Sequence, residues 1–128
     1  MIIGVGVDIM KIQRMESAIQ RSGEIFLNRI FTPSELKEAG QGKDYVAFLA
    51  TRFAGKEAIL KTIGTGWSSG VRLTEIEILN GKFGEPLVSF SGKFNEIISQ
   101  LNGQILISLS YDTDYAVAIA ILSKRDPL

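Results

Sequence analysis

The chain has 128 residues, 45% of them hydrophobic and 22% charged, which is the composition of a globular protein with one domain of common size. Its 14 basic and 14 acidic residues cancel, so no net field attracts nucleic acid or an anionic membrane, and we expect neither as a partner. Without histidine or cysteine, the chain has no imidazole base, serine-histidine-acid triad, disulfide or thiolate metal site. Its chemistry must use carboxylates, lysine, arginine, hydroxyls, backbone amides or a hard metal such as magnesium.

The apolar runs and the N-terminus indicate the cellular compartment in which we expect the protein. No apolar run is long enough to span a bilayer. The first residues, MIIGVGVDI, lack a basic region and include Asp8, so they do not resemble a signal peptide. We therefore expect one cytoplasmic domain over residues 1–128.

Residues 2 to 9 alternate as a strand does, with large apolar side chains on one face and small or acidic residues on the other. The two faces carry Ile3, Val5, Val7 and Ile9 on one side and Gly4, Gly6 and Asp8 on the other. Glycines inside a strand indicate that another element packs closely there, so Asp8 lies on a closely approached face. Alternatively, Asp8 only caps the helix that follows.

Three helices are predicted next. The first covers about residues 11–21 and the second about residues 24–30. The sequence Thr32-Pro33-Ser34-Glu35 is a capping box with proline at the first helical position, and it predicts a third helix that ends near Gly40.

The most informative stretch is the long helix predicted from Asp44 to Gly66, which has no internal proline and ends at glycines. Apolar residues on two sides of this helix indicate that it is buried. Its remaining sector combines alanines with Glu57 and Lys61, so that another element can approach closely. An ionised Glu57 beside the apolar stripe would cost several kcal/mol without a cation or hydrogen-bond donors.

Glu57 and Lys61 allow a simpler interpretation. They are four residues apart with the acid first, which is the spacing of an ordinary ion pair within a helix. Such a pair contributes a few tenths of a kcal/mol and needs no function.

The second half of the chain predicts strands and one helix. A loop at residues 67–70 precedes a strand-like stretch at 71–79 in which Leu73 departs from the alternation, and a turn leads to a strand at 87–90. Ser91 is expected to cap a helix that closes at Asn102-Gly103. Strands at 104–110 and 115–122 flank an acidic hairpin turn. The sequence thus predicts an α+β fold, with helices on one face of a mainly antiparallel sheet.

These features together predict a magnesium-dependent site for phosphate. Two carboxylates, Asp8 and Glu57, are a typical protein contribution to a magnesium site. Gly64-Thr65-Gly66 could offer backbone amides to phosphate oxygens. Because a helix C-terminus repels anions, a phosphate there also needs the charge of Lys61.

Three blocks of sequence resemble a known family. GVGVDIMKIQR at 4–14, RFAGKEAILKTIGTG at 52–66 and ISLSYDTDYAVAIA at 107–120 are similar in order and spacing to the holo-(acyl carrier protein) synthases, which are small trimeric 4′-phosphopantetheinyl transferases. The resemblance implies the fold of that family, magnesium on Asp8 and Glu57, and coenzyme A as a substrate. A serine of apo acyl carrier protein would attack the β-phosphate, giving the holo carrier for fatty acid biosynthesis and adenosine 3′,5′-bisphosphate.

The resemblance also implies roles for single residues. Lys61 matches the lysine near the phosphates, and Gly64, Thr65 and Gly66 match the loop beside the nucleotide. Arg52 lies in the same motif and is expected to contact coenzyme A. Glu57, directly or through a metal-bound water, is expected to help remove the serine proton.

One position departs from the family pattern. Tyr111 stands where the family usually has histidine, and a phenol with a pKa near 10 cannot serve as a base at neutral pH. Asp112 or a metal-bound water would then accept the proton, and Tyr111 would contact the ligand. Alternatively, Tyr111 is a plain turn aromatic that contacts the ligand or the neighbouring strand. A second interpretation of the whole chain is a non-catalytic homologue that binds coenzyme A or a nucleotide, with Tyr111 as the sign of lost chemistry. A different magnesium-dependent phosphate enzyme, such as a phosphohydrolase, is a third interpretation.

The basic residues and the assembly are further expectations. Most of Arg14, Arg21, Lys37, Lys43, Arg52 and Lys56 are expected to be solvated surface charges. Because acyl carrier proteins are acidic, the resemblance implies that Arg14 and Arg21 dock the carrier. It also implies a homotrimer with active sites between subunits.

Overall fold

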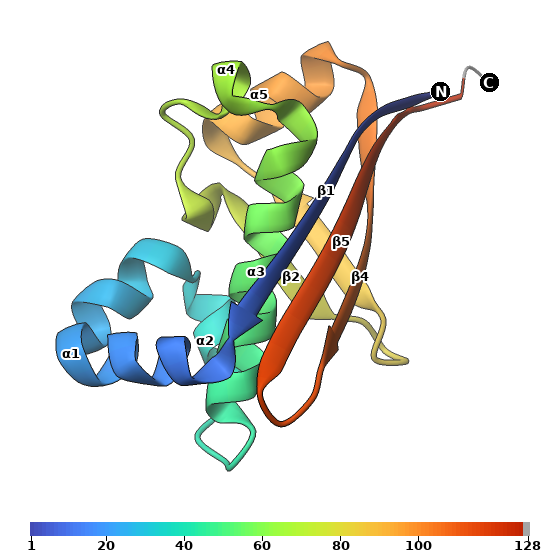
Figure 1. The fold of residues 1–128 in the computed structure, drawn as a ribbon. Helices are drawn as coiled ribbons and strands as arrows, with labels where there is room; N and C mark the ends of the chain where they lie inside the picture. Colours follow the sequence, from blue (N-terminus) through green and yellow to red (C-terminus); the bar gives the residue numbers. More distant parts are fainter. Residues whose placement is uncertain (127–128) are drawn as a thin grey trace.

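The computed structural model describes residues 1–126. A three-stranded sheet runs along one side of a long central helix, and the other helices and a two-stranded hairpin surround the rest of that helix (Figure 1). The elements in chain order are β1 Ile2–Lys11, α1 Ile12–Ile30, α2 Pro33–Ala39, α3 Tyr45–Ile63, α4 Thr65–Ser68, the 3-10 turn η1 Leu73–Glu75, β2 Ile76–Asn80, β3 Pro86–Phe90, α5 Gly92–Gln100, β4 Gly103–Tyr111 and β5 Tyr115–Lys124. The predicted α+β class with antiparallel sheets around a central helix is confirmed.

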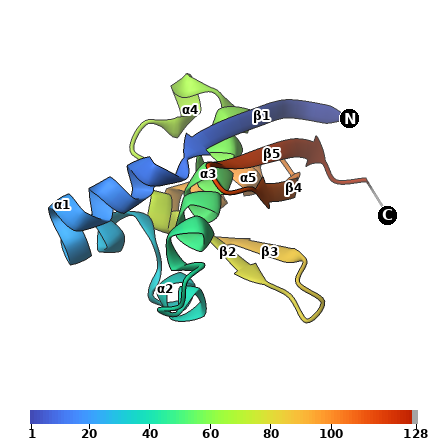
Figure 2. The ribbon, with the colours of Figure 1, turned by 60° about the horizontal axis from the view of Figure 1, so that its bottom comes forward.

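The main sheet has the order β1-β5-β4, with both pairs antiparallel. Asp8 pairs with Ala118, and Tyr111 pairs with Ala116. The strands β2 and β3 form a second, separate hairpin, which projects away from the main sheet on the side of α3 opposite to α1 (Figure 2). The sequence predicted one sheet, and the structure divides it in two.

Helix α3 is buried because small residues on both partners let the sheet approach it. Ala54 and Ala58 of α3 and Ala118 and Ala120 of β5 are fully buried. The glycine face of β1 lies directly on α3, since a Cβ on Gly4 would lie 2.0 Å from the carbonyl oxygen of Thr62. This close approach, predicted from the glycines of the strand, brings the acidic residue of β1 next to α3.

The helices before α3 follow the sequence closely. The two predicted helices at 11–21 and 24–30 are the two halves of α1, which bends at Gly23 with a φ of 53°. The capping box of α2 is present, with Thr32 Oγ1 accepting from the Glu35 backbone N–H.

Several local predictions are wrong. Ser91 precedes α5 without capping it through a side-chain hydrogen bond; the Phe94 N–H donates to the Glu75 carboxylate instead. Leu73 leaves the predicted strand because it begins the η1 turn.

Most of the six basic residues are exposed, as predicted, and two of them are buried. Lys56 is fully buried and Arg52 is 5% exposed. Lys56 Nζ donates to Glu35 Oε1 at 2.6 Å and to the carbonyl oxygens of Ile30 and Leu73, because only such partners offset the cost of a buried charge.

Within residues 1–126, no helix is both long enough and apolar enough to cross a membrane.

Candidate functional site

The carboxylate of Asp8 and the ammonium of Lys61 meet where β1 crosses α3. Lys61 Nζ donates to Asp8 Oδ1 at 3.1 Å and to the carbonyl oxygen of Val7 at 2.8 Å. The Lys61 side chain is 52% exposed and that of Asp8 is 20% exposed. Glu57 lies one turn before Lys61 on α3 and is half-buried. The structure therefore brings together the three residues on which the predicted site depends.

The pKa of Glu57 shows that the two carboxylates lie within each other's field. Burial is the largest cause that raises the pKa of Glu57 above its ordinary value, and the negative charge of Asp8 raises it further. The positive charge of Lys61 acts in the opposite direction. Two acids within each other's field, with one lysine paired to Asp8, form a site that a further cation would stabilise.

The simpler interpretations of these residues are wrong. Lys61 forms its ion pair with Asp8, not with Glu57, so the acid and the lysine of α3 are not an isolated helix pair. Asp8 does not cap α1, because β1 continues to Lys11 and Lys11 is the N-cap residue.

The donor set fits magnesium better than a transition metal. Within residues 1–126, no cluster of three or more histidine, cysteine or acidic residues could hold a metal by itself. Magnesium needs only one or two protein carboxylates, since waters and substrate phosphates complete its octahedron. Asp8 and Glu57 match that requirement and supply only oxygen ligands.

The glycine turn follows the lysine directly. Gly64 ends α3 with a φ of 75°, and its N–H donates to the carbonyl oxygen of Lys61. The predicted loop at residues 67–70 is partly helical, because α4 begins at Thr65. Gly66 has open space where a side chain would stand, so its backbone remains accessible beside the site.

Arg52 faces away from this group. Its Nε donates to the carbonyl oxygen of Ile78, its Nη2 donates to Asn80 Oδ1, and the Glu38 carboxylate lies 3.5 Å away. Burial lowers the pKa of Arg52, while Glu38 opposes that change. A pocket of about 260 Å³ that includes both Arg52 and Tyr111 lies beside the β2–β3 hairpin. Within one chain, Arg52, which was predicted to contact coenzyme A, thus lies apart from Asp8 and Glu57.

The hairpin turn between β4 and β5 carries the other predicted residues. Tyr111 is 50% exposed. Asp112 Oδ1 accepts from the backbone N–H groups of Asp114 and Tyr115 at 2.8 and 2.7 Å. These backbone hydrogen bonds lower the pKa of Asp112, which makes it a weaker base and a clear stabiliser of the turn.

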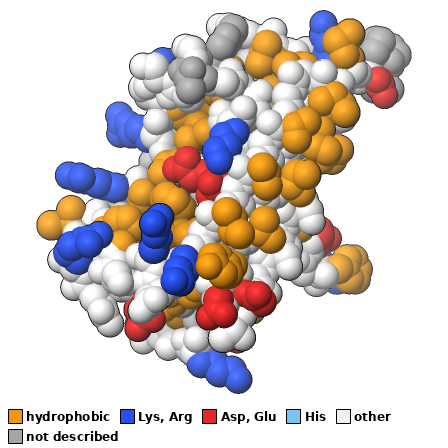
Figure 3. Space-filling model, viewed as in Figure 1, with side chains coloured by type: hydrophobic (Ala, Val, Ile, Leu, Met, Phe, Trp, Pro, Cys, Tyr) orange, Lys and Arg blue, Asp and Glu red, His pale blue; other side chains and the backbone are white. Residues whose placement is uncertain are grey.

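A basic surface lies next to the acidic group. Lysine and arginine side chains gather over α1, near an acidic patch on the same face (Figure 3). Lys11, Arg14 and Arg21 line a pocket of about 480 Å³ with Gln13 and Ser17. Arg14 and Arg21 are exposed, as predicted for residues that dock an acidic partner.

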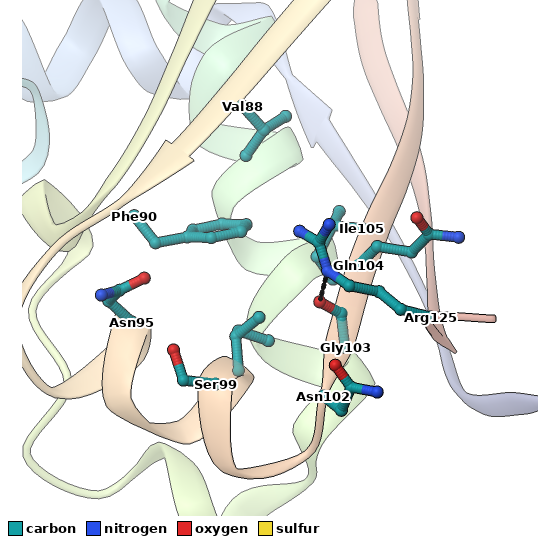
Figure 4. Close-up of a pocket in the computed structure, with 10 residues that line it drawn as sticks. Val88, Phe90, Asn95, Ser99, Asn102, Gly103, Gln104, Ile105 and Arg125 are labelled. Atoms are coloured by element: carbon teal, nitrogen blue, oxygen red, sulfur yellow. Dashed lines mark hydrogen bonds between the residues drawn. The ribbon is translucent and has the colours of Figure 1, made fainter. Parts of the chain in front are cut away.

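A separate pocket of about 530 Å³ lies between β3, α5 and β4 (Figure 4). Phe90 and Val88 form an apolar wall, and Arg125 points inward while its Nε donates to the carbonyl oxygen of Gly103. The ten residues that line it include no carboxylate, so this pocket does not supply metal ligands.

Comparison with known proteins agrees with this geometry. Residues 4–120 match the family described as the 4′-phosphopantetheinyl transferase superfamily. A holo-[acyl-carrier-protein] synthase of Vibrio cholerae is 45% identical over 126 residues, which is 98% of this chain and 100% of that protein. The synthase of Halorhodospira halophila is 43% identical over 123 residues, which is 95% of this chain and 98% of that protein.

Solved structures extend the likeness to the fold. The crystal structure of the synthase from Neisseria meningitidis superimposes with a TM-score of 0.87 at 32% identity, covering 97% of this chain and 100% of that one. The synthase from Bacillus anthracis, in complex with CoA (3′,5′-ADP), gives a TM-score of 0.81 at 31% identity, covering 98% and 99%. The synthase from Helicobacter pylori, in complex with coenzyme A, gives 0.80 at 31% identity, covering 93% and 99%.

Proposed function

Because this chain belongs to the 4′-phosphopantetheinyl transferase superfamily, we propose that it moves 4′-phosphopantetheine from coenzyme A to a serine of apo acyl carrier protein. The serine oxygen forms a bond to the β-phosphorus, and the bond from that phosphorus to the bridging oxygen breaks. The products are the holo carrier, for use in fatty acid biosynthesis, and adenosine 3′,5′-bisphosphate. The relatives named above support this substrate pair, since two of their structures contain coenzyme A or its nucleotide.

The meeting of Asp8, Glu57 and Lys61 carries the proposal. Phosphoryl transfer depends mainly on positioning and on neutralising charge. Lys61 reaches the surface from the last turn of α3 and offers a cation beside the glycine turn, where phosphate oxygens would accept backbone hydrogen bonds. Glu57, whose pKa without a metal is raised by burial and by Asp8, would help remove the serine proton directly or through a metal-bound water.

Magnesium is the cofactor that these residues would hold. Asp8 and Glu57 would each supply a carboxylate oxygen, and the close packing of β1 on α3 fixes the two carboxylates relative to each other. When bound, the ion would neutralise phosphate charge and polarise the bond to the attacked phosphorus.

The carrier protein docks on α1 in this proposal. Arg14 and Arg21 present positive charge to an acidic partner, and Ile25 adds an apolar side chain that is 69% exposed. This surface lies beside the acidic group, so a carrier bound there would bring its serine toward the β-phosphate.

A homotrimer would account for the exposed apolar side chains on the outer face of the main sheet. Large apolar side chains cover that face in both edge and central strands, where a lone protomer would leave them in water. They include Ile3 (40% exposed), Val5 (56%), Val7 (57%), Ile9 (64%), Leu106 (59%), Val117 (37%) and Ile119 (44%). Burying this face between copies would also allow Arg52 and Tyr111 of one protomer to face the Asp8 and Glu57 of another, since one protomer keeps them apart.

Product analysis tests the proposed function. The protein is incubated with coenzyme A and magnesium, with and without apo acyl carrier protein, and the nucleotides are separated by chromatography. The proposal predicts that adenosine 3′,5′-bisphosphate is released only when the carrier is present. Release without a carrier would indicate a hydrolase, and binding without release would indicate a non-catalytic homologue; either result would overturn the proposal.

A further inference from the structure

The single positive charge of Lys61 interacts with two acidic residues, Asp8 and Glu57. Its ammonium bonds to Asp8 Oδ1 and to the carbonyl oxygen of Val7, and its charge also lowers the pKa of Glu57 against the effect of burial. In the protein without metal, this lysine is therefore the counter-ion of both carboxylates.

The charges at this site do not balance with Lys61 alone. Asp8 and Glu57 carry two negative charges when ionised, and Lys61 supplies one positive charge. A divalent cation on the two carboxylates would neutralise both, and it would repel the ammonium that lies 3.1 Å from Asp8. A bound metal therefore opposes the Asp8–Lys61 contact through charge repulsion, and directly if it takes Asp8 Oδ1.

The side chain of Lys61 is free to move away. It is 52% exposed, and lysine is a point charge on a flexible stem. The glycine turn begins at Gly64, one turn further along the helix. A lysine released from Asp8 would therefore be close to a phosphate bound at that turn, because the lysine and the turn belong to the same short segment.

We propose that Lys61 is an exchangeable counter-ion, which holds Asp8 in the metal-free protein and is released to the phosphates of coenzyme A when the metal binds. This inference rests on the proposed function, because it requires the metal on Asp8 and Glu57. Before coenzyme A arrives, Lys61 opposes metal binding because it holds Asp8. Once the metal is bound, the same lysine stabilises the phosphates of coenzyme A. Metal and coenzyme A then favour each other's binding through the movement of one side chain.

Calorimetric titrations test the exchange without measuring turnover. Magnesium is titrated into the full chain in the absence of coenzyme A, for the wild type, Lys61→Met and Lys37→Met. Lys37 is an exposed residue of α2 outside the site, so its variant controls for the lost charge. Coenzyme A is then titrated into each protein at saturating magnesium.

The inference predicts two changes of opposite sign. Lys61→Met should bind magnesium more tightly, by about two- to fivefold, since a partly exposed ion pair opposes the metal by that order. The same variant should bind coenzyme A more weakly, and Lys37→Met should match the wild type in both titrations. A general folding defect would weaken both ligands, so the opposite signs exclude such a defect. Lys61→Gln repeats the test with a polar neutral side chain should the methionine disturb the fold.

The contrary results separate the inference from the proposed function. Weaker magnesium binding by Lys61→Met and Lys61→Gln, with the wild type still binding, would show that Lys61 supports the metal site; the exchange would be refuted while the proposed function stood. If magnesium does not bind to any of these proteins, with or without coenzyme A, the proposed metal site fails and the exchange fails with it.

Discussion

A Cβ atom placed on Gly6 would lie 1.9 Å from the carbonyl oxygen of Ala58. The backbone of β1 therefore rests directly on the backbone of α3 at this point. Asp8 is two residues further along β1, and Glu57 immediately precedes Ala58 on α3. The contact between Gly6 and Ala58 thus sets the separation of the two carboxylates.

Gly6→Ala should damage stability and activity together. The added methyl group cannot fit, so β1 must move away from α3, at a cost of about 1–3 kcal/mol for an overpacked core. We expect a lower melting temperature and a large loss of transferase activity. Gly42→Ala is the control, because no atom lies within 4 Å of a Cβ at that position. Wild-type stability and turnover in Gly6→Ala would contradict the account.

Glu57→Gln should separate stability from function. Removing a half-buried negative charge that lies beside Asp8 relieves an unfavourable interaction, so the metal-free variant should melt at a higher temperature than the wild type near neutral pH. Magnesium should then raise the melting temperature of the wild type only. Thermal melts with chelator and with excess magnesium check both points. Equal stabilisation of the two proteins by magnesium would exclude Glu57 as a ligand.

Reversing the charges of α1 should weaken binding of the carrier alone. Arg14→Glu combined with Arg21→Glu is expected to raise the Michaelis constant for apo acyl carrier protein by about tenfold or more, because complementary charges guide and hold the complex. The affinity for coenzyme A should not change. Lys37→Glu combined with Lys124→Glu makes the same change in net charge elsewhere on the surface. If both double variants behave alike, α1 is not the docking surface.

Asp112→Asn should retain most of the activity. The asparagine oxygen can still accept from the N–H groups of Asp114 and Tyr115, and the lowered pKa of Asp112 argues against its role as a base. We expect turnover within about threefold of the wild type. A loss of a hundredfold with an intact fold would restore Asp112 as the base, as the sequence predicted. Tyr111→His, tested alongside, measures what the unusual tyrosine costs.

The same variant should show a defined pH dependence of stability. Because hydrogen bonds lower the pKa of Asp112 in the folded protein, its contribution to stability is present above its ordinary pKa of 3.8 and is lost as the pH falls through the lowered value. The wild type should therefore melt above Asp112→Asn at neutral pH, and the difference should disappear in acid. A difference that grows in acid would contradict this assignment.

A charge on the outer face of the main sheet should break the assembly. Ile119→Glu places a carboxylate among the exposed apolar side chains of β5, and we expect sedimentation to show a monomer without transferase activity. Ile25→Glu introduces the same charge on α1 and should remain trimeric. A wild-type protein that sediments as a monomer at working concentration would refute the trimer itself.

The sequence could predict those parts of the site that depend on local pattern. Alternating glycines in residues 2–9 indicated that another element packs closely on β1, and the sector of alanines in α3 indicated a close approach to that helix. The sequence grouped Asp8 with Glu57 in one predicted site, but it did not identify α3 as the element that β1 contacts. The kink of α1 follows from Gly23 in the same way, since that residue separates two helical patterns.

Other features depend on contacts between residues that are far apart in the chain. The periodicity of the sequence reports only local structure, so it cannot predict these contacts. The sequence did not single out Lys56 and Arg52 as the buried basic residues, because their partners are distant: Glu35 lies 21 positions from Lys56 and Ile78 lies 26 positions from Arg52. The partner of Lys61 is Asp8, 53 positions away, where the sequence offered Glu57 as an equally good neighbour. The sequence likewise could not predict that the strands form two sheets, because each strand has an alternating pattern similar to that of its neighbours.

The intact mass of apo acyl carrier protein, measured after incubation with coenzyme A and magnesium, tests the central claim most directly. The wild type should add the mass of one phosphopantetheine arm to the carrier. Glu57→Gln and a chelator-treated sample should add none, while Glu96→Gln, an exposed acid on α5 outside the site, should match the wild type. An unchanged carrier with the wild type, or an equal mass gain with Glu57→Gln, would show that the Asp8, Glu57 and Lys61 site does not perform the transfer.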